Sequence, residues 1–170
     1  MDCLYAPWRE SYSKAVAQSK NEETTQDQCV FCQHFSQSLD EDHFILKRFK
    51  HCIIMLNKYP YNAGHLLILP LKHVDSLHLM PQEARTELMA LMNQSINIVK
   101  KVLHCDGLNA GFNLGKAAGA GIPSHLHVHI LPRFLGDTNF LPTLSNTKAI
   151  SFDLAKIYRQ LKPEFDTLIL

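Results

Sequence analysis

The pattern with the clearest chemical potential in this chain is a row of histidines separated by single residues. Its members are His125, His127 and His129. Side chains of an extended strand alternate between two faces, so the three imidazoles share one face and the apolar residues between them share the other. Packing alone does not account for such a row, because each buried imidazole needs a hydrogen-bond partner. The pattern therefore predicts a functional site on an apolar backing.

Two chemistries suit a row of histidines: metal binding by the imidazoles, and nucleophilic attack by one of them. The preceding loop contains Gly115, Gly119 and Gly121, whose missing side chains let backbone N–H groups approach an anion such as phosphate. The only carboxylate within ten residues of the row is Asp137, although metal-bound histidines usually have such partners. The sequence favours attack on phosphorus, with a catalytic metal as the alternative.

A second reactive pattern is the pair Cys29 and Cys32 in C-V-F-C. This spacing is typical of zinc ligands, and tetrahedral zinc would need two more. Buried free thiols are the other interpretation of the pair. The chain has five cysteines, an odd number that does not suit a disulfide framework.

Composition limits the classes of function. The 170 residues suffice for one domain with a full core, and the net charge of +1 gives no basic field for a nucleic acid polymer. No apolar run approaches the roughly 20 residues of a membrane helix, and the first residues lack the order of a signal peptide. We therefore expect a cytoplasmic protein that binds neither nucleic acid polymers nor membranes.

Hydrophobic periodicity and turn residues predict the elements that position these side chains. Strands are expected at 43–49, 51–57, 65–70, 107–114 and 125–132. Helices are expected at 81–104 and at 151–161, the second with Ser151 as a candidate N-cap. The longer helix carries a buried stripe that should pack across the sheet: Leu88, Met92, Ser95, Val99 and Leu103. The predicted fold class is α+β, a mainly antiparallel sheet with one long and one shorter helix.

We expect a single domain over 1–170 with three parts. These are an N-terminal docking segment and exposed loop (1–28), a core (29–141), and a C-terminal helix and tail (142–170).

The segment H-L-H-V-H-I-L-P-R (125–133) resembles the H-x-H-x-H signature of the histidine-triad (HIT) superfamily. The similarity extends to further positions: Asn57, Pro60, Gly64, His65, Gly111, Asn113 and Gly115. Four segments are similar to bacterial diadenosine tetraphosphate phosphorylases and fragile-histidine-triad-like proteins: A-P-W-R (6–9), C-V-F-C (29–32), G-A-G-I-P-S-H-L-H-V-H (119–129) and G-D-T-N-F (136–140).

The resemblance implies a HIT-like fold and a role for each histidine. His127 would be the nucleophile that forms a nucleotidyl-histidine intermediate, with the backbone carbonyl of His125 accepting a hydrogen bond from its ring. His129 and His65 would donate hydrogen bonds to the phosphoryl oxygens. The side chain of Asn113 and the backbone from Gly119 through Gly121 to Ser124 would complete this cradle.

The resemblance also implies contacts with the rest of a nucleotide substrate. Asn57 would bind the ribose, Phe31 would lie against the base, and Asn139 would reach the second half of a dinucleotide. Core packing is an equally good interpretation of Phe31. A role in a turn is an equally good interpretation of Asn139.

Similarity to related proteins that have a Cys-x-x-Cys pair implies a structural zinc site in this chain. Its ligands would be Cys29, Cys32, His73 and His125. No redox or organic cofactor is expected. The family further implies a homodimer in which the long helix and a sheet edge form the interface.

The implied substrate is a dinucleoside polyphosphate, cleaved by hydrolysis or by phosphorolysis. The alternatives are a nucleotide-binding sensor with little turnover, a purine nucleoside phosphoramidase, and a metal-dependent hydrolase that uses the histidine row as ligands. The phosphoramidase branch has a polar pair shortly before the first histidine, whereas this chain has Gly121 and Ile122 there. That departure favours dinucleoside polyphosphates.

Overall fold

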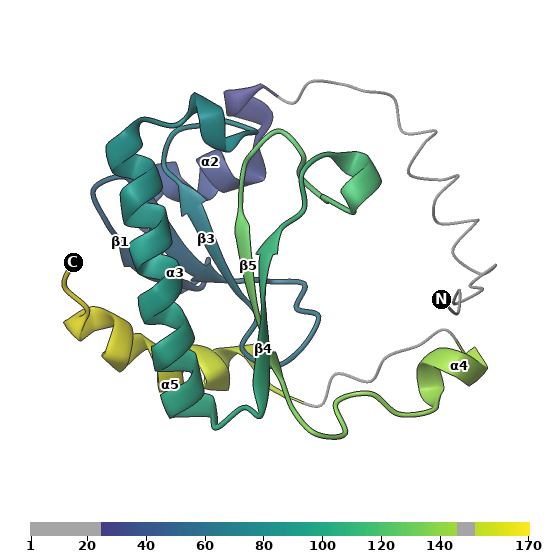
Figure 1. The fold of residues 1–170 in the computed structure, drawn as a ribbon. Helices are drawn as coiled ribbons and strands as arrows, with labels where there is room; N and C mark the ends of the chain where they lie inside the picture. Colours follow the sequence, from purple (N-terminus) through teal and green to yellow (C-terminus); the bar gives the residue numbers. More distant parts are fainter. Residues whose placement is uncertain (1–24, 146–151) are drawn as a thin grey trace.

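The computed structural model describes residues 25–145 and 152–170, which build one antiparallel five-stranded sheet (Figure 1). Its strands, in spatial order, are β1 (Ile45–Arg48), β2 (Cys52–Leu56), β3 (Leu66–Pro70), β5 (Val128–Arg133) and β4 (Gly107–Phe112). Every neighbouring pair is antiparallel. The predicted α+β class is confirmed, and β3 and β5 lie side by side at the centre.

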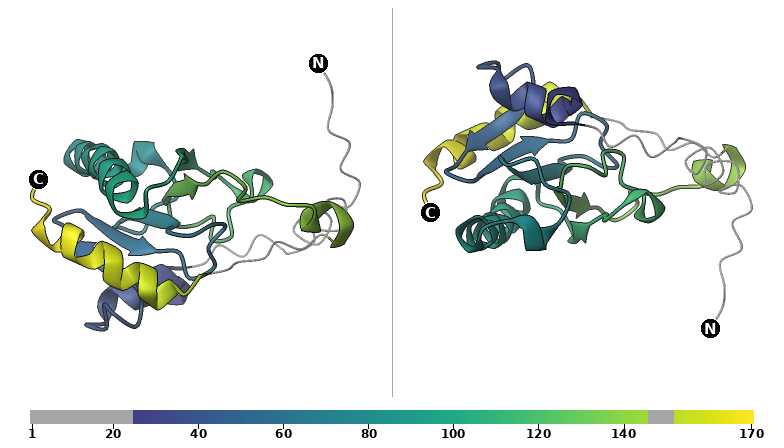
Figure 2. Two further views of the ribbon diagram at one scale, coloured as in Figure 1. Left: turned by 90° about the horizontal axis from the view of Figure 1, so that it is seen from below. Right: turned by 90° about the horizontal axis from the view of Figure 1, so that it is seen from above.

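Helices cover both faces of this sheet. The long helix α3 (Gln82–Leu103) and the C-terminal helix α5 (Leu154–Thr167) share one core cluster with β2, β3 and β5. The short helix α2 (Val30–Ser36) packs on the opposite face, where Phe31 meets the other side chains of β1, β2 and β3. Figure 2 shows α3 and α2 on opposite sides of the strands. The sequence did not predict α2, because seven residues without a side-chain cap have little helical signal and depend on this packing.

The stripe predicted for α3 is largely confirmed. Leu88, Ser95 and Val99 are buried, and Met92 and Leu103 pack partly buried against the same core. The helix ends at Leu103, because His104 adopts a left-handed backbone.

The C-terminal helix begins later and runs further than predicted. Its N-cap is Asp153, whose carboxylate accepts a hydrogen bond from Ala155 N–H at 2.9 Å, while the predicted cap Ser151 lies outside the described residues. The helix continues through Pro163, although proline forfeits one backbone hydrogen bond. Leu161 and Phe165 are fully buried on either side of it, and their packing offsets that loss.

The predicted strand at 125–132 begins only at Val128, so His125 and His127 lie in the segment that precedes β5. The reason is that the neighbouring strand β3 ends at Pro70. The N–H of Leu126 therefore donates its hydrogen bond to the carbonyl of Val74, at 2.6 Å, in the segment that follows β3. The alternation of faces nevertheless holds. Leu126, Val128 and Ile130 all belong to the core on the α3 side.

The other four predicted strands are also too long: 51–57 is β2 (Cys52–Leu56), and 65–70 begins one residue before β3. The strand expected at 43–49 is β1 (Ile45–Arg48), because Phe44 has a φ of 55° that extended backbone does not allow. The strand expected at 107–114 ends at Phe112. Residues 1–24 of the predicted docking segment and loop (1–28) lie outside the described residues, and Gln26–Gln28 form a short 3-10 helix. In the part of the chain that is described, no helix is both long and apolar enough to cross a membrane.

We expect Gly64→Ala to lower the free energy of unfolding by roughly 1–3 kcal/mol. Gly64 has a φ of +74°, and an added Cβ would lie 2.2 Å from Leu103 Cδ1 and 3.4 Å from Pro132 Cγ. Urea denaturation measures the change. Gly111→Ala is the matched control, since nothing lies within 4 Å of a Cβ there. Equal stability of the two variants would contradict the prediction.

Candidate active site

The pairing of β3 with β5 brings the predicted histidines together. His129 lies opposite Leu67 in this ladder, and His65 immediately precedes β3. His65 Nε2 is consequently 2.8 Å from His129 Nδ1. The rings of His127 and His129 are neighbours, with centroids 4.8 Å apart. The structure therefore places His65, which is 62 residues before His127 in the sequence, beside the histidine row.

Hydrogen bonds define which nitrogens of His65 and His129 carry protons. The backbone N–H of Tyr61 donates to His65 Nδ1 at 3.2 Å, and the Asn57 side-chain amide lies 3.2 Å from the same nitrogen. Since Nδ1 is an acceptor, His65 carries its proton on Nε2 and donates it to His129 Nδ1. The proton of His129 is then on Nε2. Asn113 Nδ2 lies 3.4 Å from this nitrogen; both atoms are donors in this arrangement, so they do not bond to each other and both remain available to one acceptor.

Burial keeps both of these histidines neutral. Desolvation, with a smaller contribution from neighbouring His129, lowers the pKa of His65 to about 3. Desolvation followed by the neighbouring His127 lowers the pKa of His129 to about 4. Neutral imidazoles act here through single, directed N–H groups rather than as cations.

The geometry around His127 matches that of a nucleophile. Its Nδ1–H donates to the carbonyl oxygen of His125 at 2.7 Å, so the lone pair is on Nε2. The side chain is 7% exposed, and burial lowers its pKa, which keeps that lone pair free of a proton. The carbonyl acceptor expected from the sequence is in place.

Phe31 lies against the histidines from the α2 side. Its ring centroid is 5.6 Å from those of both His125 and His127, and the residue is 8% exposed. It is therefore a packing partner of the nucleophile's ring and belongs to the core cluster on this face. Contact with a base stays a prediction.

The glycine loop provides turns and one unsatisfied hydroxyl. Gly115 and Gly119 flank a short 3-10 helix with φ values of 80° and 90°, a conformation that glycine adopts without strain. Gly121 follows in the same loop, and no atom lies within 4 Å of a Cβ added there. Ser124 Oγ is buried and has no hydrogen-bond partner in the described structure. An unsatisfied buried hydroxyl beside His125 is the kind of group that a bound phosphate would satisfy.

Asn139 is not among the residues that contact the histidines in the hydrogen bonds and ring contacts described above. Its Oδ1 accepts a hydrogen bond from Leu141 N–H at 2.9 Å and so caps the short helix α4 (Leu141–Ser145), with its side chain exposed. The structure favours the turn interpretation. Contact with the second half of a dinucleotide stays a prediction.

A second cluster lies directly behind the histidine row. It joins the four ligands named above for zinc, and their donor atoms all lie within 4.8 Å of one another: Cys29, Cys32, His73 and His125. Cys32 Sγ is 3.3 Å from His73 Nδ1 and 3.5 Å from His125 Nδ1, and Cys29 Sγ is also 3.5 Å from His125 Nδ1. Tetrahedral zinc with ordinary bond lengths would separate sulfur and nitrogen ligands by roughly 3.5 Å. The four residues can hold a metal ion.

Two further observations fit a cation in this cluster. His125 Nε2–H donates to the carbonyl of Pro70 at 2.9 Å, which leaves Nδ1 as the free ligand atom. Burial, together with the neighbouring Cys29, raises the pKa of the Cys32 thiol to about 12. A metal ion would relieve this by binding the thiolate.

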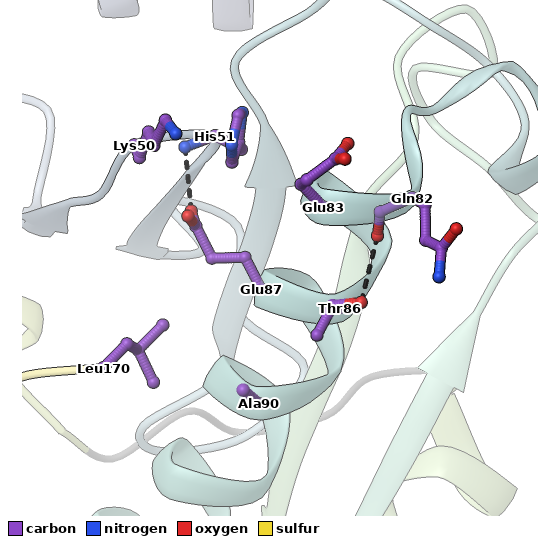
Figure 3. Close-up of a pocket in the computed structure, with 8 residues that line it drawn as sticks. All are labelled: Lys50, His51, Gln82, Glu83, Thr86, Glu87, Ala90 and Leu170. Carbon is purple, nitrogen blue, oxygen red and sulfur yellow. Dashed lines mark hydrogen bonds between the residues drawn. The ribbon is translucent and has the colours of Figure 1, made fainter.

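A surface pocket elsewhere takes no part in this site. It has a volume of about 540 Å³ and is shown in Figure 3. Its lining comes from the first half of α3, the β1–β2 turn and the C-terminus: Lys50, His51, Gln82, Glu83, Thr86, Glu87, Ala90 and Leu170. Glu87 accepts hydrogen bonds from the backbone N–H groups of His51 and Cys52, both at 2.8 Å. This carboxylate therefore anchors the β1–β2 turn to α3.

Sequence reasoning missed Tyr61, a residue of the predicted turn at 58–64. Its ring lies 4.7 Å from that of His65 and stacks on that of His129, with centroids 5.9 Å apart and planes at 16°. The nearby aromatic pair in K-Y-P-Y was the available signal. The turn residues alone did not show which way that ring would point.

An antiparallel sheet in which β3, β5 and the residues just before them carry three neighbouring histidines, next to a Cys/His cluster, defines a protein of the histidine-triad class. The HIT domain family model matches residues 38–136, and the chain belongs to this family. AP-4-A phosphorylase of Mycobacterium tuberculosis is 33% identical over 162 residues, 95% of this chain and 83% of that protein. The asymmetrical bis(5'-nucleosyl)-tetraphosphatase of Schizosaccharomyces pombe is 30% identical over 55% of this chain and 50% of its own length.

Solved structures agree with this assignment. A zinc-bound histidine triad family protein from Mycobacterium smegmatis superposes with a TM-score of 0.67 at 25% identity, covering 84% of this chain and 96% of that one. The resemblance inferred from the sequence motifs is confirmed.

Proposed function

We propose that this protein cleaves dinucleoside polyphosphates of the diadenosine tetraphosphate type through a covalent nucleotidyl-histidine intermediate on His127. The observation that carries the proposal is the hydrogen bond from His127 Nδ1–H to the His125 carbonyl, which leaves the Nε2 lone pair of the neutral ring free to act as a nucleophile. The similarity to the M. tuberculosis AP-4-A phosphorylase over 95% of the chain supports the substrate class.

The reaction would have two displacements. In the first, His127 Nε2 forms a bond to phosphorus, and the bond from phosphorus to the leaving phosphate oxygen breaks with its electron pair. His129 Nε2–H and the Asn113 amide would donate hydrogen bonds to the oxygens on which charge grows. In the second, water or inorganic phosphate attacks the same phosphorus and releases His127. Either acceptor balances the reaction.

The other substrate contacts follow from positions on the loops. The cradle would use Ser124 Oγ, which is buried without a partner, and the backbone near Gly119 and Gly121. Asn57, whose amide lies 3.2 Å from His65 Nδ1, is the proposed ribose contact.

The Cys29–Cys32–His73–His125 cluster would hold a structural zinc ion. Its donor set, two thiols and two imidazole Nδ1 atoms, is typical of closed zinc sites. When bound, zinc would supply a cross-link that ties α2 to the segment before β5. The His125 carbonyl stays free to orient His127, so the two roles are compatible.

The sheet edge β4 is open in the described chain, which suits the homodimer that the family resemblance implies. Molar mass by light scattering tests that state. A cytoplasmic location stays a prediction.

Product analysis tests the proposed reaction. We expect diadenosine tetraphosphate to give ADP plus ATP when inorganic phosphate is the acceptor, or AMP plus ATP when water is. Incubation with and without phosphate, followed by chromatography of the nucleotides, separates the two acceptors. Tight nucleotide binding without any product would indicate a nucleotide-binding sensor and would refute the proposed enzymatic function.

A further inference from the structure

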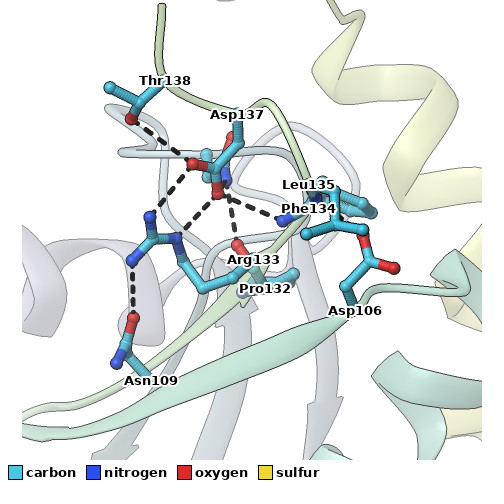
Figure 4. A network of polar contacts seen from close by, with 9 residues as sticks. Asp106, Asn109, Pro132, Arg133, Phe134, Leu135, Asp137 and Thr138 are labelled. Atoms are coloured by element: carbon cyan, nitrogen blue, oxygen red, sulfur yellow. Dashed lines mark hydrogen bonds and ion pairs between the residues drawn. The ribbon is translucent and has the colours of Figure 1, made fainter.

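The loop after β5 contains a carboxylate that is almost excluded from solvent. The Asp137 side chain is 6% exposed and lies at the centre of the network in Figure 4. Its Oδ2 accepts hydrogen bonds from Arg133 Nε at 2.7 Å, Asn62 Nδ2 at 2.7 Å and Phe134 N–H at 3.1 Å, and its Oδ1 accepts one from Arg133 at 3.0 Å. Hydrogen bonds to an ionised carboxylate are among the strong ones, so this node is rigid.

Asn62 connects this node to the histidines. It is 8% exposed, and its Nδ2 also donates to the Pro132 carbonyl at 3.0 Å, so both amide hydrogens are used. Its own backbone carbonyl accepts a hydrogen bond from His65 N–H at 3.2 Å. The adjacent residue, Tyr61, provides the N–H that donates to His65 Nδ1. The Asn62 side chain therefore sets where this part of the turn lies relative to β5.

The position of that turn matters because Tyr61 N–H is one of the two donors, with the Asn57 amide, that keep the proton of His65 on Nε2. With Tyr61 N–H on His65 Nδ1, the imidazole proton is on Nε2 and points at His129. The His129 proton is then on Nε2. If the turn moved, His65 Nδ1 would lose its backbone donor and keep only the Asn57 amide, so the other tautomer of His65 would become more populated.

We propose that Asp137 is a positioning residue: by holding the Asn62 amide it keeps Tyr61 N–H on His65, and thereby maintains the His65–His129 tautomers that catalysis needs. The proposal rests on the proposed function of His129 as a donor to the phosphoryl group. None of the hydrogen bonds named above joins Asp137 to His129 or to His127. Its effect passes through the turn.

The test is Asp137→Asn, which keeps the size of the side chain but directs an amide against the Asn62 and Arg133 donors. We expect kcat for diadenosine tetraphosphate to fall by about 10- to 100-fold, because small misplacements of catalytic groups have effects of this size. KM should change by less than ~3-fold, since the substrate contacts remain. In 15N spectra of the histidine rings, His65 should change from the Nε2–H tautomer to a mixture.

Asp106→Asn is the matched control. Asp106 accepts a hydrogen bond from Leu135 N–H at 2.7 Å in the same loop but does not contact Asn62. This variant should keep the wild-type kcat and the wild-type His65 spectrum. If it behaved like Asp137→Asn, general order of the loop would explain both variants, and the proposal would be wrong.

Asn62→Ala provides a second route, which also serves if Asp137→Asn does not fold. It should reproduce the loss of kcat and the change in the His65 tautomer. In the double variant kcat should be no lower than in the less active of the two single variants, because both substitutions act through one contact. Independent, multiplied effects would overturn the proposal, as would an unchanged His65 spectrum in Asp137→Asn. The spectra decide this even if the wild-type protein turned over no dinucleotide, a result that would refute only the proposed function.

Discussion

Replacing His127 with Asn is expected to lower the turnover of diadenosine tetraphosphate by at least ~300-fold while nucleotide binding is largely kept. The substitution removes the Nε2 lone pair that would attack phosphorus. It leaves the proposed binding groups, such as Asn57 and Ser124, unchanged. Turnover is measured by product chromatography, and binding by calorimetry with a nonhydrolysable dinucleotide.

The intermediate itself gives an independent readout. Wild-type protein denatured at alkaline pH during turnover, where the phosphorus–nitrogen bond survives, should show a mass increase of one nucleotidyl group in intact-mass spectra, and His127→Asn should show none. His104→Asn is the control, because His104 is exposed and its left-handed backbone, with a φ of 49°, suits Asn. An adduct of equal amount in His127→Asn would place the nucleophile elsewhere.

Replacing Cys32 with Ser is expected to abolish stoichiometric zinc and to lower the free energy of unfolding by roughly 3 kcal/mol or more. Cys32 Sγ lies within 3.5 Å of Nδ1 of both His73 and His125, so its loss removes the sulfur that contacts both imidazole ligands. Elemental analysis of the purified protein measures the metal, and chemical denaturation measures the stability.

Cys105→Ser is the control for this prediction. Cys105 is a partly buried free thiol that does not belong to the four-residue cluster. Its substitution should leave the zinc content unchanged. A Cys32→Ser protein with one zinc per chain and wild-type stability would contradict the assignment of the site.

Activity should also fall in Cys32→Ser, for a reason that the geometry provides. His125 is both a proposed zinc ligand and the source of the carbonyl that orients His127. Loss of a bound metal would loosen the segment before β5, and with it the nucleophile. Wild-type protein treated with a chelator should lose stability and activity together, whereas a metal that took part in the chemical step would affect activity alone.

Local spacing was enough to predict the histidine row, the Cys-x-x-Cys pair, the five strands and the two longer helices α3 and α5. Alternation along 125–130 put the imidazoles and the apolar residues on opposite faces, and the core confirms that arrangement. The glycine loop, Asn57 and His65 were recognised through similarity to a family. Membership of that family is confirmed by the match over residues 38–136.

The boundaries of the elements and the short helices were harder to predict from the sequence. The helix α2 depends on the burial of Phe31 against the sheet. The strand β5 begins late because the N–H of Leu126 bonds to the carbonyl of Val74 instead of to β3. Asp153 replaced Ser151 as the cap of α5. In each case a contact distant in sequence, or a choice between two similar neighbours, decided the outcome.

The sequence by itself therefore determined which residue types face one another along a strand, since a period of two residues is a local property of extended backbone. Only the tertiary structure decided which partners those residues meet. Cys29 and His125 are 96 positions apart, and His65 and His129 are 64 apart. The proton positions on His65, His127 and His129 depend on single backbone groups, among them Tyr61 N–H and the His125 carbonyl. The spacing of residues carries no information about those directions, because they arise only when the sheet brings separate segments within hydrogen-bond distance.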